Sequence, residues 1–164
     1  MCIRDSDITS NLCEEKGFLA YEVSNYAQAG SESVHNLVYW RYGDYIGIGP
    51  GAHGRLTIDG KRYATETFLS PEEWLTKVDN QGSGVSFLSE LSQEQQAAEM
   101  AMMGLRLNEG INFKRFENLS GSSFSEEKLS FLKSIQLIEQ KDGNIIATFS
   151  GRKVLNSVLA ELLN

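Results

Sequence analysis

Both histidines of the chain lie in one short segment, SESVHNLVYWRYGDYIGIGPGAHG, which runs from Ser31 to Gly54. The same segment holds one of the two tryptophans, three of the six tyrosines and a cluster of glycines. A neutral imidazole nitrogen binds iron or zinc, flat aromatic rings line cofactor sites, and glycine lets the backbone approach a ligand closely. The combination predicts a binding site in this segment.

Within HNLVYW, His35 is the better candidate for a metal ligand, because haem iron often takes a single axial histidine. Tyr39 and Trp40 would then supply the flat apolar walls that suit a porphyrin. The alternative is structural: a loop histidine bonded to the backbone, with the aromatic side chains anchoring the loop to the core. Since a lone histidine is a weak signal for a ligand, the residues alone favour this structural alternative.

The second candidate site is GIGPGAHG, which follows a short predicted strand, Tyr45–Ile48. Glycines at the carboxyl end of a parallel sheet let the backbone approach a ligand, and His53 would contact a nucleotide ring or cap the turn. The spacing differs from the dinucleotide-binding fingerprint, and Pro50 interrupts it. A tight structural loop is the alternative, and the residues leave both open.

Several other classes of protein are excluded or disfavoured. A net charge of −7 argues against a nucleic-acid partner and against a polybasic membrane anchor. No apolar run reaches the roughly 20 residues that a spanning helix needs. Cys2 and Cys13 belong to no CxxC pair, which excludes a structural zinc site and favours a reducing cytosol. The Ser-His-Asp, P-loop and HExxH patterns are also missing from the sequence.

The elements expected to position these residues begin with a helix from Ile8 to Lys16 and a strand in FLAYEVSNYA. A helix that passes through Gly17 into a strand is typical of a parallel α/β sheet. We therefore predict that the segments 21–24 and 45–48 are neighbouring parallel strands. A hairpin at Asp59-Gly60 and a helix capped by Ser70 follow.

After a predicted linker, QGSGVS, the pattern changes. A helix capped by Ser92 and stopped at Gly110, two further helices, a hairpin at Asp142-Gly143 and a closing helix predict a winged-helix-like module. The second of the two further helices, which begins near Ser125, carries as many acids as lysines, so DNA binding is discounted. The three methionines between residues 100 and 103 do not share a helix face, which indicates core filling.

At YEVSNYA, HNLVYW, DYIGIGPGAHG and MMGLRLNEGI the chain resembles the radical SAM proteins of the coproporphyrinogen III oxidase-like family, and within it the HemW-type haem chaperones. The resemblance covers nearly the whole chain after about Phe18. It implies the end of a TIM-like α/β barrel followed by a small C-terminal domain. The expected division is residues 1–6 as non-native sequence, 7–80 as the barrel end with a haem-motif loop, and 88–164 as the winged-helix-like α+β domain.

The resemblance also implies roles for residues. HNxxYW is linked to haem in this family, which carries over onto His35, Asn36, Tyr39 and Trp40, with His35 as the candidate iron ligand. The glycine-rich loop lies near the adenosylmethionine adenine, so contacts with S-adenosylmethionine are expected from Gly49, Ala52 and His53.

The expected function is the C-terminal part of a haem chaperone that delivers haem to recipient haemoproteins such as respiratory enzymes. The alternative is a fragment of an oxygen-independent coproporphyrinogen III oxidase of porphyrin biosynthesis. The CxxxCxxC motif that binds a 4Fe–4S cluster is not in the sequence, so the cluster and S-adenosylmethionine are expected in a full-length parent and no radical chemistry from this chain. A cytoplasmic location is expected, which allows peripheral membrane association.

Overall fold

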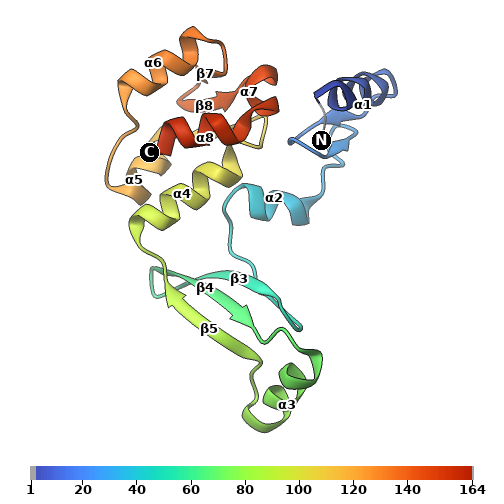
Figure 1. The fold of residues 1–164 in the computed structure, drawn as a ribbon, viewed down its shortest axis with the longest axis vertical. Helices are drawn as coiled ribbons and strands as arrows, with labels where there is room; N and C mark the ends of the chain where they lie inside the picture. Colours follow the sequence, from blue (N-terminus) through green and yellow to red (C-terminus); the bar gives the residue numbers. More distant parts are fainter. Residues whose placement is uncertain (1–2, 164) are drawn as a thin grey trace. The chain divides into compact units, whose positions relative to one another are not determined.

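The computed structural model describes the backbone of residues 3–163 and the side chains of residues 7–163. The prediction that residues 1–6 are non-native sequence, Cys2 included, falls on residues whose side chains the structure does not describe. The chain forms two compact units (Figure 1): Met1–Tyr42 together with Ala97–Asn164, and Gly43–Gln96. The expected division into domains 7–80 and 88–164 stays a prediction, and the contacts of this chain group residues 1–42 with residues 97–164.

The first unit begins with helix α1 (Ile3–Glu15), strands β1 (Leu19–Ala20) and β2 (Tyr26–Ala27), and helix α2 (Val34–Trp40). Gly17 has φ +78° and ends the first helix, as predicted. β1 and β2 pair antiparallel, so the expected single strand is two short ones joined by a turn.

The predicted parallel pairing of residues 21–24 with 45–48 is wrong. Residues 21–24 form the turn between β1 and β2, in which the Glu22 carboxylate accepts hydrogen bonds from the Ser24 backbone N–H and the Asn25 side chain. Tyr45 forms an isolated antiparallel bridge with Arg55. Side-chain hydrogen bonds stabilise a turn where the sequence pattern predicted a strand. Every strand pair that the structure describes is antiparallel.

The C-terminal part of the first unit places helices around a small sheet of strand order β6-β8-β7. Helix α4 ends at Gly104 rather than at Gly110, and the closing helix is divided into two at Val154. The winged-helix-like assignment stays a prediction. The elements are α4 (Gln93–Gly104), β6 (Ile111–Asn112), α5 (Phe113–Ser120), α6 (Glu126–Ser134), β7 (Ile138–Lys141), β8 (Asn144–Ala147), α7 (Phe149–Lys153) and α8 (Leu155–Leu163).

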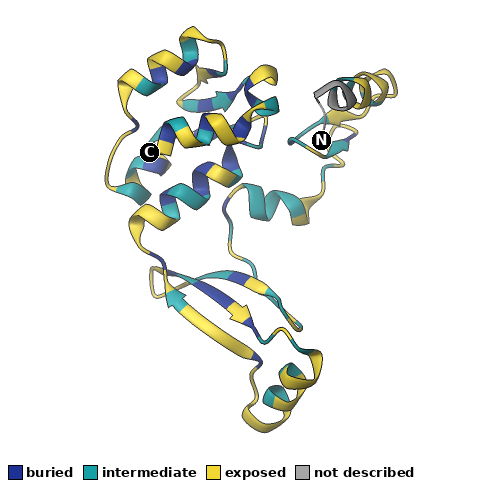
Figure 2. Ribbon diagram, viewed as in Figure 1, coloured by how far each residue is buried: buried dark blue, intermediate teal, exposed yellow. Residues whose placement is uncertain are grey.

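The hydrophobic core of this unit lies between the C-terminal helices and the small sheet (Figure 2). Leu105, Leu129, Ile145 and Val158 are wholly buried, and each contributes about 1.5–3 kcal/mol of transfer free energy. No helix in the described part of the chain has the length and apolar character needed to cross a membrane.

The second unit is a three-stranded antiparallel sheet, β3 (His53–Ile58), β4 (Lys61–Thr67) and β5 (Val85–Glu90), with helix α3 (Pro71–Gln81) in the connection between β4 and β5. The predicted hairpin is confirmed: Asp59 and Gly60 have φ values of +50° and +78°. Ser70 caps α3, also as predicted. The predicted linker is shorter than expected, because Val85 and Ser86 already belong to β5.

Candidate functional site

The HNLVYW segment forms helix α2, not the loop that the sequence predicted. Ser33 is its N-cap, and the Ser33 hydroxyl accepts a hydrogen bond from the Asn36 N–H. Residues four apart lie on the same side of a helix. The motif therefore divides into two neighbouring pairs, His35 with Tyr39 and Asn36 with Trp40.

The first pair is open to solvent at His35, which is exposed. His35 Nε2 lies 2.9 Å from the Tyr39 hydroxyl, and the two rings meet edge to face with their centroids 4.8 Å apart. This bond orients the imidazole and leaves Nδ1 on the other side of the ring. Among the described residues no group of three or more His, Cys, Asp or Glu could hold a metal ion. Haem supplies its own nitrogen ligands and needs only an axial one, so a single reachable imidazole fits haem and does not fit a bare ion.

The second pair holds the helix to the rest of the unit. Asn36 Nδ2 donates to the Tyr21 hydroxyl over 3.3 Å. The Arg106 guanidinium lies over the Trp40 ring, 4.4 Å from its centroid, in a cation–π contact. Trp40 is therefore covered by a cation on one face, and Asn36 and Trp40 act here as structural contacts of α2.

Glu22 is the residue that sequence reasoning missed. Its side chain is 0% exposed, and its carboxylate accepts from Arg106 Nε at 3.2 Å and Arg106 Nη2 at 3.0 Å. Glu22 thus fixes Arg106, and Arg106 lies over Trp40, so YEVSNYA, GLRL and HNLVYW meet at one place. An acid in the middle of an apolar run was the available signal, because a buried carboxylate needs a partner.

The C-terminal end of α2 is fixed by charge. Arg41 Nε and Nη2 donate to the two carboxylate oxygens of Glu109 over 2.7 and 2.8 Å. The hydrogen bond from Arg41 lowers the pKa of Glu109, and the same bond raises the pKa of Arg41. Both side chains are about half exposed, so solvent screens the pair and its contribution to stability is small.

The three candidate residues for S-adenosylmethionine are Gly49, Ala52 and His53. They belong to the second unit, whereas the α2 residues belong to the first. Thr67 holds their loop to β4: its hydroxyl donates to the Gly49 carbonyl at 2.6 Å and accepts from the Ala52 N–H at 2.8 Å. The exposed His53 has Nδ1 3.7 Å from a carboxylate oxygen of Glu66.

Two glycines of GIGPGAHG serve packing. A Cβ on Gly47 would lie 2.5 Å from the His53 carbonyl oxygen, and one on Gly54 would lie 2.4 Å from the Thr65 hydroxyl. These contacts account for the glycines without a ligand. The contact of this loop with S-adenosylmethionine stays a prediction.

Comparison with known proteins places the chain in a family. The model of the HemN C-terminal domain matches residues 91–154. Radical S-adenosyl methionine domain-containing protein 1 of Danio rerio is 36% identical over an alignment that covers 92% of this chain and 36% of the relative. The heme chaperone HemW of Bacillus subtilis is 32% identical, with 96% of this chain and 41% of the relative covered.

The fold has a counterpart among solved structures. The coproporphyrinogen III oxidase HemN of Escherichia coli, described as a radical SAM enzyme, matches with a TM-score of 0.68 at 16% identity, over 95% of this chain and 39% of that one. The chain spans about two fifths or less of the length of these proteins. From the family model and the relatives together, the chain contains a HemN C-terminal domain and is homologous to radical S-adenosyl methionine domain-containing protein 1 and to HemW.

Proposed function

We propose that this chain is the part of a haem chaperone that binds haem, with His35 as the axial ligand of the iron. The observation that carries the proposal is the exposed imidazole on a helix that Asn36 and Trp40 hold through the neighbouring face. Relatives from Bacillus subtilis and Haemophilus influenzae bear the name heme chaperone HemW, which supports the same function.

The roles within the motif follow from the two pairs. His35 binds the iron and Tyr39, whose hydroxyl is bonded to Nε2, lies against the porphyrin edge. Asn36 and Trp40 hold α2 in place, and their effect on haem is indirect. One exposed ligand gives reversible binding, which a protein that hands haem to recipient haemoproteins such as respiratory enzymes requires.

The remaining assignments belong to a longer protein. There Gly49, Ala52 and His53 contact S-adenosylmethionine, and a 4Fe–4S cluster is bound outside this chain. The cytoplasm is the proposed location, with delivery by peripheral contact at a membrane. The alternative, an oxygen-independent coproporphyrinogen III oxidase, is supported by the HemN family model. Decarboxylation of coproporphyrinogen III by the longer protein would favour that alternative.

Hemin titration of the chain, followed in the Soret region, tests the proposal. We expect His35→Ala to weaken hemin binding by about tenfold or more and to shift the Soret band, because one iron–nitrogen bond is lost. His53→Ala is the matched control, since His53 is the other histidine of the chain, is also exposed and lies in the other unit. Equal spectra and affinities for both variants would show that the iron ligand lies elsewhere.

A further inference from the structure

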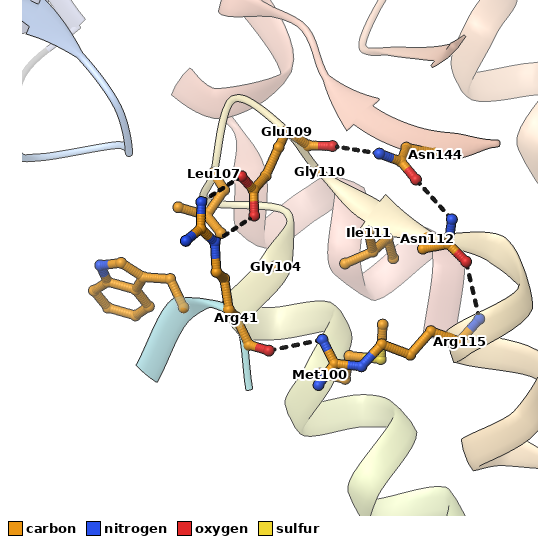
Figure 3. A pocket seen from close by; sticks show the side chains of 11 residues that line it. Arg41, Met100, Gly104, Leu107, Glu109, Gly110, Ile111, Asn112, Arg115 and Asn144 are labelled. Atoms are coloured by element: carbon orange, nitrogen blue, oxygen red, sulfur yellow. Dashed lines mark hydrogen bonds and ion pairs between the residues drawn. The ribbon is translucent and has the colours of Figure 1, made fainter. Parts of the chain in front are cut away.

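A pocket of about 280 Å³ lies at the C-terminal end of α2, within the first unit (Figure 3). The buried side chains of Met100, Leu107 and Ile111 give it an apolar floor. Its rim is polar and charged. The rim residues are Arg41, Glu109, Asn112, Arg115 and Asn144.

The rim is closed by a continuous ring of hydrogen bonds, which Figure 3 shows as dashed lines. Arg41 donates to the Glu109 carboxylate, and Asn144 Nδ2 donates to the Glu109 carbonyl at 3.1 Å. Asn112 Nδ2 donates to Asn144 Oδ1 at 3.0 Å, and Asn112 Oδ1 accepts from the Arg115 N–H at 3.1 Å. Arg115 Nη1 donates to the Arg41 carbonyl at 2.8 Å and closes the ring. The rim is therefore organised before any ligand arrives.

The charges of this rim favour an anion. Arg41 and Arg115 carry two positive charges and Glu109 one negative charge, so the rim has a net charge of +1 in a chain of net charge −7. The Arg41 guanidinium uses two nitrogens on Glu109, and the Arg115 guanidinium uses one on the Arg41 carbonyl and one on the Tyr42 carbonyl. Each guanidinium has further N–H groups that a ligand could use. Both oxygens of the Glu109 carboxylate already accept from Arg41. The rim therefore has spare hydrogen-bond donors, which a ligand with acceptor atoms would use.

We propose that this pocket binds a carboxylate carried on a small apolar ring, with the ring on the Met100–Leu107–Ile111 floor and the carboxylate at Arg41 and Arg115. The volume is below that of a site for a drug-sized molecule and suits a single ring. Two sources supply this chemistry. One is the propionate-bearing edge of haem, which rests on the proposed function because Arg41 follows the haem motif directly; the other is a free aromatic acid.

Benzoate is the probe for the pocket, followed by the side-chain amide signals of Asn112 and Asn144 in ¹H–¹⁵N NMR spectra of the chain. We expect these signals to shift on titration. Arg41→Met should weaken benzoate binding by about tenfold, since a charge-assisted hydrogen bond is lost. Glu109→Gln should strengthen it, because it frees Arg41 and raises the charge of the rim. Both variants break the same ion pair, so a purely structural effect would move both in the same direction.

The ion pair of Lys61 and Glu90 provides a matched control, because it is similarly exposed and lies in the other unit. Lys61→Met and Glu90→Gln should leave the benzoate shifts unchanged. Absence of benzoate shifts in the unsubstituted chain, or a loss of binding in both Arg41→Met and Glu109→Gln, would overturn the proposal.

Hemin and its dimethyl ester distinguish the two sources. If the haem edge occupies the pocket, esterification should weaken binding to the chain by about tenfold, and Arg41→Met should abolish that difference. Equal binding of hemin and ester, with His35 still required, would leave the proposed function intact and assign the pocket to a free aromatic acid. Failure of the chain to bind hemin would refute the proposed function, while the benzoate titration would still decide whether the pocket takes a carboxylate.

Discussion

The contact of Glu22 with Arg106 gives the sharpest test of how the haem motif is held in place. Arg106→Met keeps most of the apolar stem and removes the guanidinium. Two N–H donors to a wholly buried carboxylate are lost with it, together with the cation–π contact on Trp40. Glu22 retains two donors, the Ser24 N–H at 2.6 Å and Asn25 Nδ2 at 2.7 Å.

The magnitude follows from these contacts. Breaking a buried ion pair by removing one partner costs about 3–5 kcal/mol, and Arg106 is 27% exposed, which places the cost near the lower end, at about 3 kcal/mol. The cation–π contact adds about 1 kcal/mol. We therefore expect Arg106→Met to lower the free energy of unfolding of the first unit by about 4 kcal/mol. Combining it with Glu22→Gln should cost less than the sum of the two single changes, by about 2 kcal/mol, because the amide no longer leaves a buried charge unpaired.

Urea unfolding followed by tryptophan fluorescence measures this, since each unit contains one tryptophan. In a Trp74→Phe background the signal comes from Trp40 in the first unit alone. A loss below about 1 kcal/mol for Arg106→Met, or strict additivity in the cycle with Glu22→Gln, would refute the view that a buried ion pair fixes Trp40. We also expect Arg106→Met to bind hemin more weakly, in parallel with its lower free energy of unfolding.

Two further predictions concern the second unit. Gly47→Ala should destabilise it by about 1–3 kcal/mol in urea unfolding, because the new Cβ would meet the His53 carbonyl at 2.5 Å; an unchanged midpoint would contradict the packing role of this glycine. Burial raises the pKa of Asp44, but hydrogen bonds from Thr57 and the charge and hydrogen bond of Arg62 outweigh it, so the net pKa is lowered. Asp44 therefore stabilises the unit above the pKa of about 3.9 of an unfolded aspartate, and this stability is lost as the pH falls through the lower folded pKa. In Asp44→Asn the free energy of unfolding should depend less steeply on pH in the acid range. An equally steep dependence in this variant would contradict the prediction.

The features that the sequence predicted correctly are local ones. The hairpin at Asp142-Gly143 has φ values of +51° and +78°, as its turn residues require. The Ser92 hydroxyl accepts from the Gln95 N–H, and the Gln95 side chain accepts from the Ser92 N–H, which is the expected reciprocal cap of α4. Ser125 caps α6 with a single bond, in which its hydroxyl accepts from the Lys128 N–H. A few neighbouring residues determine such features, so they can be read from the sequence.

The features that could not be predicted depend on long-range contacts. Glu22 and Arg106 are 84 residues apart in sequence, and no local pattern indicates that they meet. The parallel pairing was inferred from the order of the elements, while the turn at Glu22 depends on hydrogen bonds from Ser24 and Asn25. The helical state of HNLVYW was missed because the segment is short and rich in aromatic and β-branched residues, whose helix propensity is low.

The division of HNxxYW into two pairs changes how variants of this motif must be interpreted. A Trp40 variant that loses haem does not identify Trp40 as a haem contact, because its ring lies under Arg106 and holds the helix that carries His35. Loss of haem with loss of stability marks a residue that positions α2, as expected for Asn36 and Trp40. Loss of haem with unchanged stability marks a residue that touches the ligand, as expected for the exposed His35, whose hydrogen bond to Tyr39 on the helix surface contributes little to folding. Measuring unfolding and hemin affinity on the same variants therefore separates the two roles, which the motif alone combines in six consecutive residues.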